Sequence, residues 1–209
     1  MMDLTQPQWV KHVLLHPFEG FEDLRWKKGG TLKYTVIIIF ALFFALIAWD
    51  RWCGFQFRPL PDALFSVMPY IMKSVVYFGA WVLGNWAVCT LLEGEGTMKN
   101  ICIYSSYALI PYIVSTFINV MLSHVLVQAE MVFFMTIYYI GLIWTGLLLF
   151  NAVKAVHQYS FSKTVAAIVL TLFAMLVILF LAVLLLSLFQ KVYVFIYSVY
   201  TEILYRVRV

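Results

Sequence analysis

The segment LGNWAVCTLLEGEGTMKNICIYSSYALIPY, residues 83–112, carries the clearest information on how this chain is built. An almost uninterrupted apolar run gives way to Glu-Gly-Glu-Gly-Thr and resumes within a few residues. Gly94 and Gly96 can adopt the positive φ angles that close the C-terminus of a helix. Thr97 can accept a backbone N–H and so cap a following helix. The segment therefore predicts two apolar helices joined by a short polar turn.

The same turn has a second interpretation, as a loop that binds an ion or a substrate through Glu93 and Glu95. Two carboxylates without further oxygen donors make a poor site for a hard cation, so the turn is favoured. His12 and His16 stand at the i, i+4 spacing of a shared metal, but the sequence offers no convincing third ligand. The three cysteines have no metal-binding spacing either. We therefore expect no metal and no cofactor.

The composition places the chain in a membrane. Of its 209 residues, 64% are hydrophobic and 11% are charged, and the mean hydropathy is +0.93. A soluble domain has about 25% charged and about 45–50% apolar residues. Membrane lipids are therefore an expected partner. The net charge of +4 does not indicate nucleic-acid binding, because the basic residues flank apolar runs, where they anchor the topology.

Five apolar runs are long enough to cross a bilayer, which takes about 20 residues of α-helix. The first contains VIIIFALFFALIAW, residues 36–49, without a charge. No internal repeat is visible. The predicted spans are Thr31–Trp49, Lys73–Leu92, Ile101–Val127, Met131–Phe150 and Thr164–Phe189.

The two ends of the chain have the pattern of helices that lie along a membrane surface. Residues 190–209 place apolar side chains on one helical face and polar ones on the other, and residues 1–30 contain two shorter faces of this kind. The predicted fold is thus all-α: a polytopic membrane helix bundle with five transmembrane helices, over residues 31–189, and interfacial amphipathic helices at both ends. The densest Lys and Arg cluster precedes the first span, which predicts a cytoplasmic N-terminus.

Polar residues inside the spans are functional hypotheses because lipid disfavours them. Asn85, far from either end of its span, is expected to form a hydrogen bond to another helix, with a permeation site as the alternative. Its neighbour Trp86 is expected to help hold that span. Pro111 predicts a kink, or a gating hinge, that frees the carbonyl of Tyr107. The structural candidates are Asn85, Trp86, Gly94, Gly96, Tyr107 and Pro111.

Several of these motifs together resemble the Yip1 domain family in its prokaryotic form. The resemblance rests on GNWAVCTLLEGEGTMKNI followed by YSSYALIPY, on the earlier HPFEGFEDLRW and on the later WTGLLLFNAVKAVHQYSFSKTVAA. It implies five transmembrane helices, a cytosolic N-terminus and, for this chain, the prokaryotic plasma membrane. Eukaryotic members of the family act in vesicle traffic and bind small GTPases, and some prokaryotic members accompany transport systems.

The expected function is that of a non-catalytic partner or scaffold subunit in a membrane complex. The chain contains no Gly-x-Ser-x-Gly, no His-Glu-x-x-His and no phosphate-binding loop, so we expect no enzymatic activity. The partner would be another integral membrane protein, with a transporter permease as the candidate suggested by the family. A small-molecule transporter or channel is the alternative, disfavoured by the lack of buried carboxylates and of inverted repeats.

Overall fold

The computed structural model describes residues 5–27, 29–58 and 65–208, and every regular element in these ranges is a helix. The outermost residues of both predicted terminal segments, 1–4 and 209, lie outside the described residues, as do 28 and 59–64. The elements are α1 (Gln6–Leu15), α2 (Gly20–Trp26), α3 (Leu32–Trp52), α4 (Met68–Ile71), η1 (Met72–Val76), α5 (Tyr77–Leu91), α6 (Met98–Ala108), α7 (Ile110–Leu122), η2 (Gln128–Glu130), α8 (Met131–His157) and α9 (Phe161–Arg208).

Five helical stretches are long and apolar enough to cross a membrane, which confirms the predicted all-α, five-span architecture. Their limits differ from the sequence-based ones. The fourth span continues past Phe150 to His157. The helix therefore extends beyond the apolar run and includes the polar residues Asn151, Lys154 and His157. The stretches are Leu32–Trp52, Met68–Leu91, Met98–Leu122, Gln128–His157 and Phe161–Arg206.

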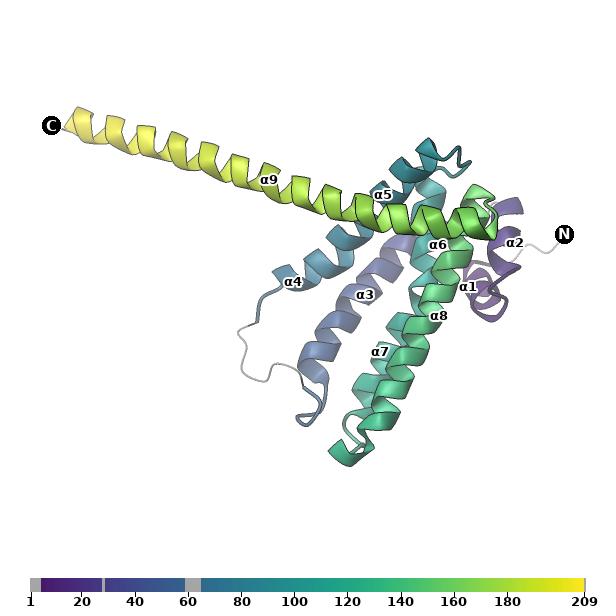
Figure 1. The fold of residues 1–209 in the computed structure, drawn as a ribbon. Coiled ribbons are helices and arrows are strands. Elements are labelled where there is room, and N and C mark those ends of the chain that lie inside the picture. The colour runs from purple at the N-terminus through teal and green to yellow at the C-terminus, as the bar shows by residue number, and fades with distance from the viewer. Residues whose placement is uncertain (1–4, 28, 59–64, 209) are drawn as a thin grey trace.

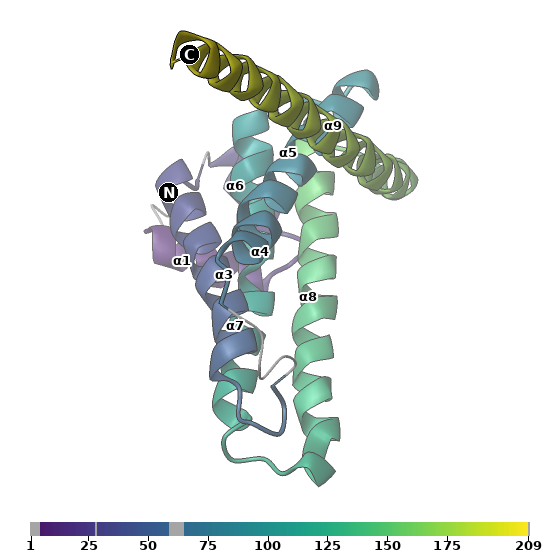
Figure 2. The ribbon, with the colours of Figure 1, turned by 90° about the vertical axis from the view of Figure 1, so that its left-hand side faces the viewer.

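The third span, formed by α6 and α7, is the centre of the bundle. It packs against both α3 and α8 and is the most deeply buried of the five spans. α5 contacts α6 and α9. Figures 1 and 2 show α3, α7 and α8 running side by side, whereas α9 crosses one end of the bundle obliquely.

The loops gather at two opposite ends of the bundle. At one end, the N–H of Gly54 donates to Ser123 Oγ (2.8 Å) and His124 Nε2 donates to the carbonyl of Trp52 (2.7 Å). At the other end, residues 92–97 meet residues 155–159. Consecutive spans therefore run in opposite directions.

The N-terminal helices belong to the bundle core. Trp9 and Val13 of α1, and Phe21 and Leu24 of α2, are all buried in the main apolar cluster. The ring of Phe21 lies 6.1 Å from that of Tyr104 on α6. These apolar faces, which the sequence identified as surface-seeking, are covered by the third and fourth spans.

The third span is interrupted in its middle. α6 ends at Ala108, Leu109 forms a turn, and α7 starts at Ile110 with Pro111 in its first turn. Proline lacks an N–H and fits best in the first turn of a helix, so the chain restarts a helix there. The N–H of Tyr112 donates to Thr145 Oγ1 of α8 (3.0 Å), which supplies the break with a partner from another span.

The second span starts earlier than predicted, at Met68, and includes one π-helical turn, η1. Such turns are rare and widen a helix locally. Lys73 lies on η1 and is exposed.

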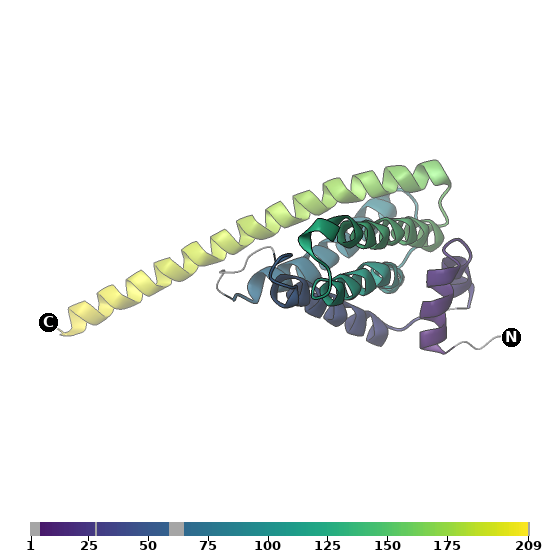
Figure 3. The same ribbon diagram turned by 90° about the horizontal axis from the view of Figure 1, so that it is seen from below.

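α9 is one continuous helix of 48 residues, so no boundary separates residue 190 from the fifth span. The predicted separate C-terminal helix is therefore the end of α9. The sequence from Phe161 to Arg208 contains neither glycine nor proline, and nothing in it interrupts the helical hydrogen bonds. Figure 3 shows the C-terminal half of α9 standing clear of the bundle.

α7 and α8 pack tightly together at Gly141. A Cβ atom placed there would overlap the side chain of Ser115 and lie 3.2 Å from the carbonyl oxygen of Pro111. Gly146, further along α8, has no atom within 4 Å of the equivalent position. Only the first of these two glycines is therefore required for helix packing.

Replacing Gly141 with alanine should destabilise the protein by about 1–3 kcal/mol, the usual cost of overfilling a packed contact. Gly146→Ala is the matched control and should leave stability unchanged or slightly higher, since glycine weakens a helix interior by about 0.5–1 kcal/mol. Thermal unfolding in detergent would measure both variants. Equal effects at the two sites would contradict this account of α7–α8 packing.

Candidate functional site

A set of hydrogen bonds, which we call the polar junction, joins α5, α8, α9 and the turn after α5. It consists of Asn85, His157, Thr171 and the backbone N–H of Gly96. Asn85 Nδ2 donates to Thr171 Oγ1 (3.2 Å), His157 Nε2 bonds with Asn85 Oδ1 (3.0 Å), and the N–H of Gly96 donates to His157 Nδ1 (3.3 Å). All three side chains are buried. Asn85 thus connects its own helix to two others.

The direction of these bonds fixes the state of the imidazole. His157 Nδ1 accepts from a backbone N–H, so the ring proton must be on Nε2, which then donates to the Asn85 carbonyl oxygen. The Thr171 hydroxyl, having accepted from Asn85, donates to the carbonyl of Ala167 (2.7 Å). Every donor in the series faces an acceptor, which is consistent with a neutral histidine. A protonated ring would turn an N–H toward that of Gly96.

The glycine-rich turn wraps around the His157 ring. A Cβ atom on Gly94 would lie 2.5 Å from His157 Nδ1 and from the Tyr159 hydroxyl, and one on Gly96 would lie 2.5 Å from His157 Cε1. These glycines are therefore needed for close approach. The prediction that they take positive φ was wrong: the left-handed residue that ends α5 is Glu93, with φ of 57°.

The end of α5 has the geometry of a Schellman cap. With Glu93 left-handed, the N–H of Gly94 reaches back to the carbonyl of Cys89 (2.7 Å). Thr97 accepts the N–H of Asn100 (3.3 Å) at the start of α6, which confirms the predicted N-cap. The turn is thus closed at both of its ends.

Tyr159 holds the start of the glycine-rich turn and packs against the His157 ring. Its single hydroxyl proton is shared between the carbonyls of Cys89 (3.1 Å) and Leu92 (3.2 Å), and its ring stacks on that of His157 at 5.3 Å. Burial, with the nearby Cys89 thiol and Glu93 carboxylate, raises the pKa of Tyr159 above its usual value. The hydroxyl therefore stays protonated and available as a donor.

Arg25 of α2 ties the N-terminal segment to the same end of the bundle. Its Nη1 donates to the carbonyls of Ala155 (2.8 Å) and Val156 (3.0 Å) in the last turn of α8, and its Nη2 bonds with Glu95. The last carbonyls of a helix lack intrahelical partners and carry the negative end of its dipole, so a cation suits them. Glu95 is 65% exposed, so the ion pair itself contributes only about 0–1 kcal/mol.

The remaining predicted site residues lie apart from the polar junction. The Trp86 side chain is 43% exposed and faces away from the buried Asn85 beside it. Tyr107 is buried and donates from its hydroxyl to Gln6 Oε1 of α1 (3.0 Å). Pro111 is at the start of α7, one helix further along the third span.

The two N-terminal histidines do not assemble a metal site. Their rings lie 5.0 Å apart, and His12 Nε2 bonds with the Asp23 carboxylate (2.9 Å) rather than sharing a ligand with His16. Among the described residues, no group of three His, Cys, Asp or Glu side chains is close enough to hold a metal ion.

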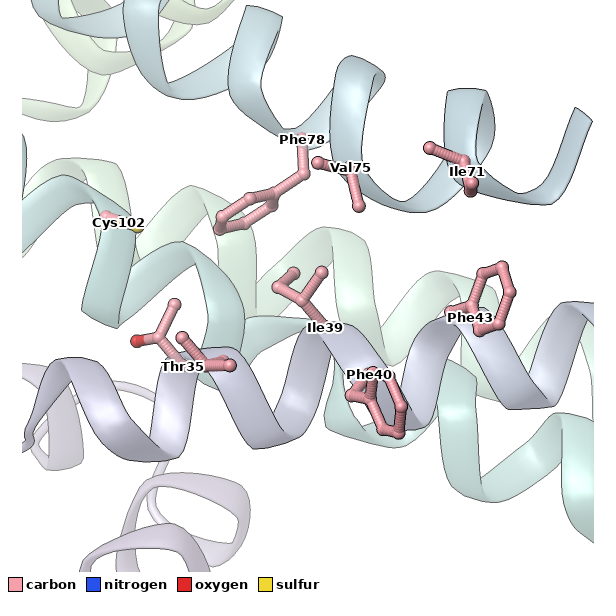
Figure 4. Close-up of a pocket in the computed structure, with 9 residues that line it drawn as sticks. Thr35, Ile39, Phe40, Phe43, Ile71, Val75, Phe78 and Cys102 are labelled. Atoms are coloured by element: carbon pink, nitrogen blue, oxygen red, sulfur yellow. The ribbon is translucent and has the colours of Figure 1, made fainter. Parts of the chain in front are cut away.

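An apolar groove of about 580 Å³ separates α3 from the second span. Figure 4 shows Val75 and Phe78 of the second span pointing toward α3, and Ile39 of α3 pointing toward them. Its polar group is the hydroxyl of Thr35, which already accepts from Ser106 Oγ (3.1 Å). The groove offers shape without directed polar contacts. Its lining residues are Thr35, Val36, Ile39, Phe40, Phe43, Ile71, Val75, Phe78 and Cys102.

Sequence reasoning missed His157, Tyr159 and Arg25. The apolar run predicts a fourth span that ends at Phe150, and this leaves His157 in a loop. A signal was present, because two glycines close together in one turn indicate a bulky group nearby as well as an unusual φ. Nothing in the sequence identified which ring they face, since more than 60 residues separate Gly96 from His157.

The arrangement is suited to joining helices. Both nitrogens of His157 are already hydrogen-bonded, and the side chain is buried. The same end of the molecule combines a left-handed cap, a glycine turn and an arginine on helix carbonyls. Together with the five apolar spans, these features define an integral membrane protein with a helical bundle fold.

The Yip1 domain family model matches residues 11–199 of the chain, and the chain belongs to this family. The match extends from α1 into the C-terminal half of α9, so it includes every residue of the polar junction. No curated protein and no solved structure matches the chain.

Asn85→Leu should lower the free energy of unfolding by about 1–2 kcal/mol, because interhelical hydrogen bonds in membranes contribute about 0.6–2 kcal/mol and this residue makes two. Trp86→Leu, one position along and partly exposed, is the control and should cost less. Thermal unfolding in detergent would compare them. A stability loss for Asn85→Leu no larger than that for Trp86→Leu would rule out the junction as a structural tie.

Proposed function

We propose that this chain is a non-catalytic subunit that binds another integral membrane protein through α9. One observation carries the proposal: every residue from Val183 through Tyr200 is exposed, and no residue after Thr171 is buried among those described in α9. Most of these side chains are Leu, Val, Phe, Ile or Tyr. Large apolar surfaces that contact nothing in their own chain are typical of interaction sites.

The helix α9 is too long for lipid contact alone to explain its exposed apolar side chains. At 1.5 Å per residue, 48 residues extend about 72 Å, more than twice the hydrocarbon thickness of about 30 Å. Without a break, α9 cannot turn into the membrane plane near Gln190. An upright α9 would leave apolar residues such as Phe195, Ile196 and Ile203 beyond the hydrocarbon. A partner that covers this part of the helix removes them from water.

The base of α9 is held firmly, which favours a fixed docking element. Thr171 is bonded to Asn85, and a Cβ atom placed on Gly84 would lie 3.3 Å from the carbonyl oxygen of Thr171, so this glycine lets α5 lie close to α9. A partner would therefore meet a preorganised helix, and little conformational entropy would be lost on binding. The family resemblance suggests a transporter permease as the candidate partner.

The proposed setting is the prokaryotic plasma membrane with the N-terminus in the cytoplasm. Lys11, Arg25, Lys27 and Lys33 all lie before or at the start of the first span, and such clusters usually remain inside. The Arg25–Glu95 contact supports placing the first segment and the glycine turn on one side.

Gentle solubilisation of the full chain should co-purify a second membrane protein. Ile196→Lys, on the apolar face of α9, should weaken that association at least about tenfold, the loss of affinity that corresponds to about 1.4 kcal/mol. Ser198→Lys introduces the same charge on the polar face and should have a smaller effect. Native pull-down with mass spectrometry would measure both.

A liposome flux assay on the isolated chain distinguishes the alternative of a transporter or channel. A monodisperse protein that has no partner and carries a solute by itself would overturn the proposal.

The orientation has its own test in a variant without native cysteines. A cysteine at Ala129, in η2, should react with a membrane-impermeant reagent from outside intact cells. A cysteine at Ser160, between α8 and α9, should react only after the membrane is opened. Both positions are exposed, so burial would not hide either one. The reverse pattern would place the N-terminus outside.

A further inference from the structure

A basic pocket of about 410 Å³ opens between α2 and the first turn of α6. It is lined by Arg25 and Trp26 from α2, by Gly30 from the linker to α3, and by Lys99 and Asn100 from α6. No acidic side chain lines it among the described residues. Its size falls in the usual range for small-molecule pockets, about 300–1,000 Å³.

The pocket holds polar donors that the rest of the described chain leaves unused. Lys99 is exposed, and no hydrogen bond or ion pair joins its ammonium to another described residue. The Asn100 side-chain amide is likewise without a hydrogen bond inside the described chain. Arg25 has five N–H donors, and its three bonds leave others available. A ligand with several acceptor oxygens and a negative charge matches this set.

The backbone of Gly30 forms part of the pocket wall. Gly30 has φ of 85°, a conformation that side chains rarely adopt, and a Cβ atom there would lie 2.7 Å from Cγ2 of Ile103. The linker therefore passes close to α6 as bare backbone.

The surroundings of the pocket belong to the edge of a membrane. Lys99 and Asn100 are in the first turn of the third span, and Gly30 lies two residues before the first span. Trp26 is 75% exposed, and tryptophan is typical of the zone where lipid meets water. A small soluble anion has no apolar surface to pack on Trp26, whereas the glycerol region of a lipid does.

The geometry points to a binding site for the phosphate group of an anionic phospholipid. Lys99 provides the principal charge, Asn100 and the unused N–H groups of Arg25 donate hydrogen bonds, and Trp26 packs against the glycerol region. Basic pockets between transmembrane helices are known to receive anionic headgroups.

Lipid titrations of the purified full chain in detergent would test the site, with native mass spectrometry as the readout. The probes are phosphatidylglycerol, phosphatidylcholine and inorganic phosphate. Lys99→Gln should weaken phosphatidylglycerol binding about fivefold, the change expected for one lysine at an anionic lipid. Lys99→Arg should bind within about twofold of the wild type, since the charge is kept.

Lys11→Gln is the matched control, because Lys11 is an exposed lysine on α1 that lies outside the pocket. It should leave phosphatidylglycerol binding unchanged. The proposal is overturned if Lys11→Gln and Lys99→Gln weaken binding equally, if phosphatidylcholine binds as tightly as phosphatidylglycerol, or if inorganic phosphate alone competes fully for the site. Lys99 is exposed and unpaired, so the Lys99→Gln variant without lipid should unfold at the same temperature as the wild type.

Discussion

The absence of water from the bilayer interior is the constraint on which this structure depends. Leaving a polar group inside the bundle unpaired costs several kcal/mol, so a partner within the protein is strongly favoured. The buried side-chain amide of Asn119 on α7 is an exception, because it makes no hydrogen bond to the described residues. Asn85, in contrast, bonds with both His157 and Thr171. The bonds can form only when α5, α8 and α9 come together in one register. This buried amide thereby favours one register of the three helices.

The same constraint explains why the polar contacts collect at one end of the bundle. The glycine turn supplies the N–H that His157 Nδ1 needs, and Tyr159 in turn holds the carbonyls at the end of α5. Arg25 brings the N-terminal helices to the last carbonyls of α8. Each of these groups would otherwise face lipid or a dry interface. Helix association in this family member therefore combines apolar packing with a small, fully paired polar centre.

Much of the architecture could be predicted because its signal is local. Apolar runs identified all five spans, and Thr97 identified the start of α6. The helix that continues past Gln190 could not be predicted from amphipathicity, since a polar stripe does not by itself interrupt a helix. Only part of the polar junction could be predicted from the sequence. The cost of burying Asn85 indicates that this residue has a hydrogen-bond partner. Which residue is the partner depends on the approach of segments more than 70 residues apart.

The shape of α9 has a mechanical consequence. Thr171 is the last buried residue among those described in α9, and Tyr200 lies 29 positions further on, a distance of about 44 Å along an unbroken helix. A continuous helix bends only gently, so it behaves as a stiff arm pivoting on its first turns. A lateral shift at the distal end therefore produces a much smaller displacement at the hydrogen bond between Thr171 and Asn85, which lies near the pivot. A force on the distal end of α9 is therefore amplified at this hydrogen bond, which sets the register of the helix.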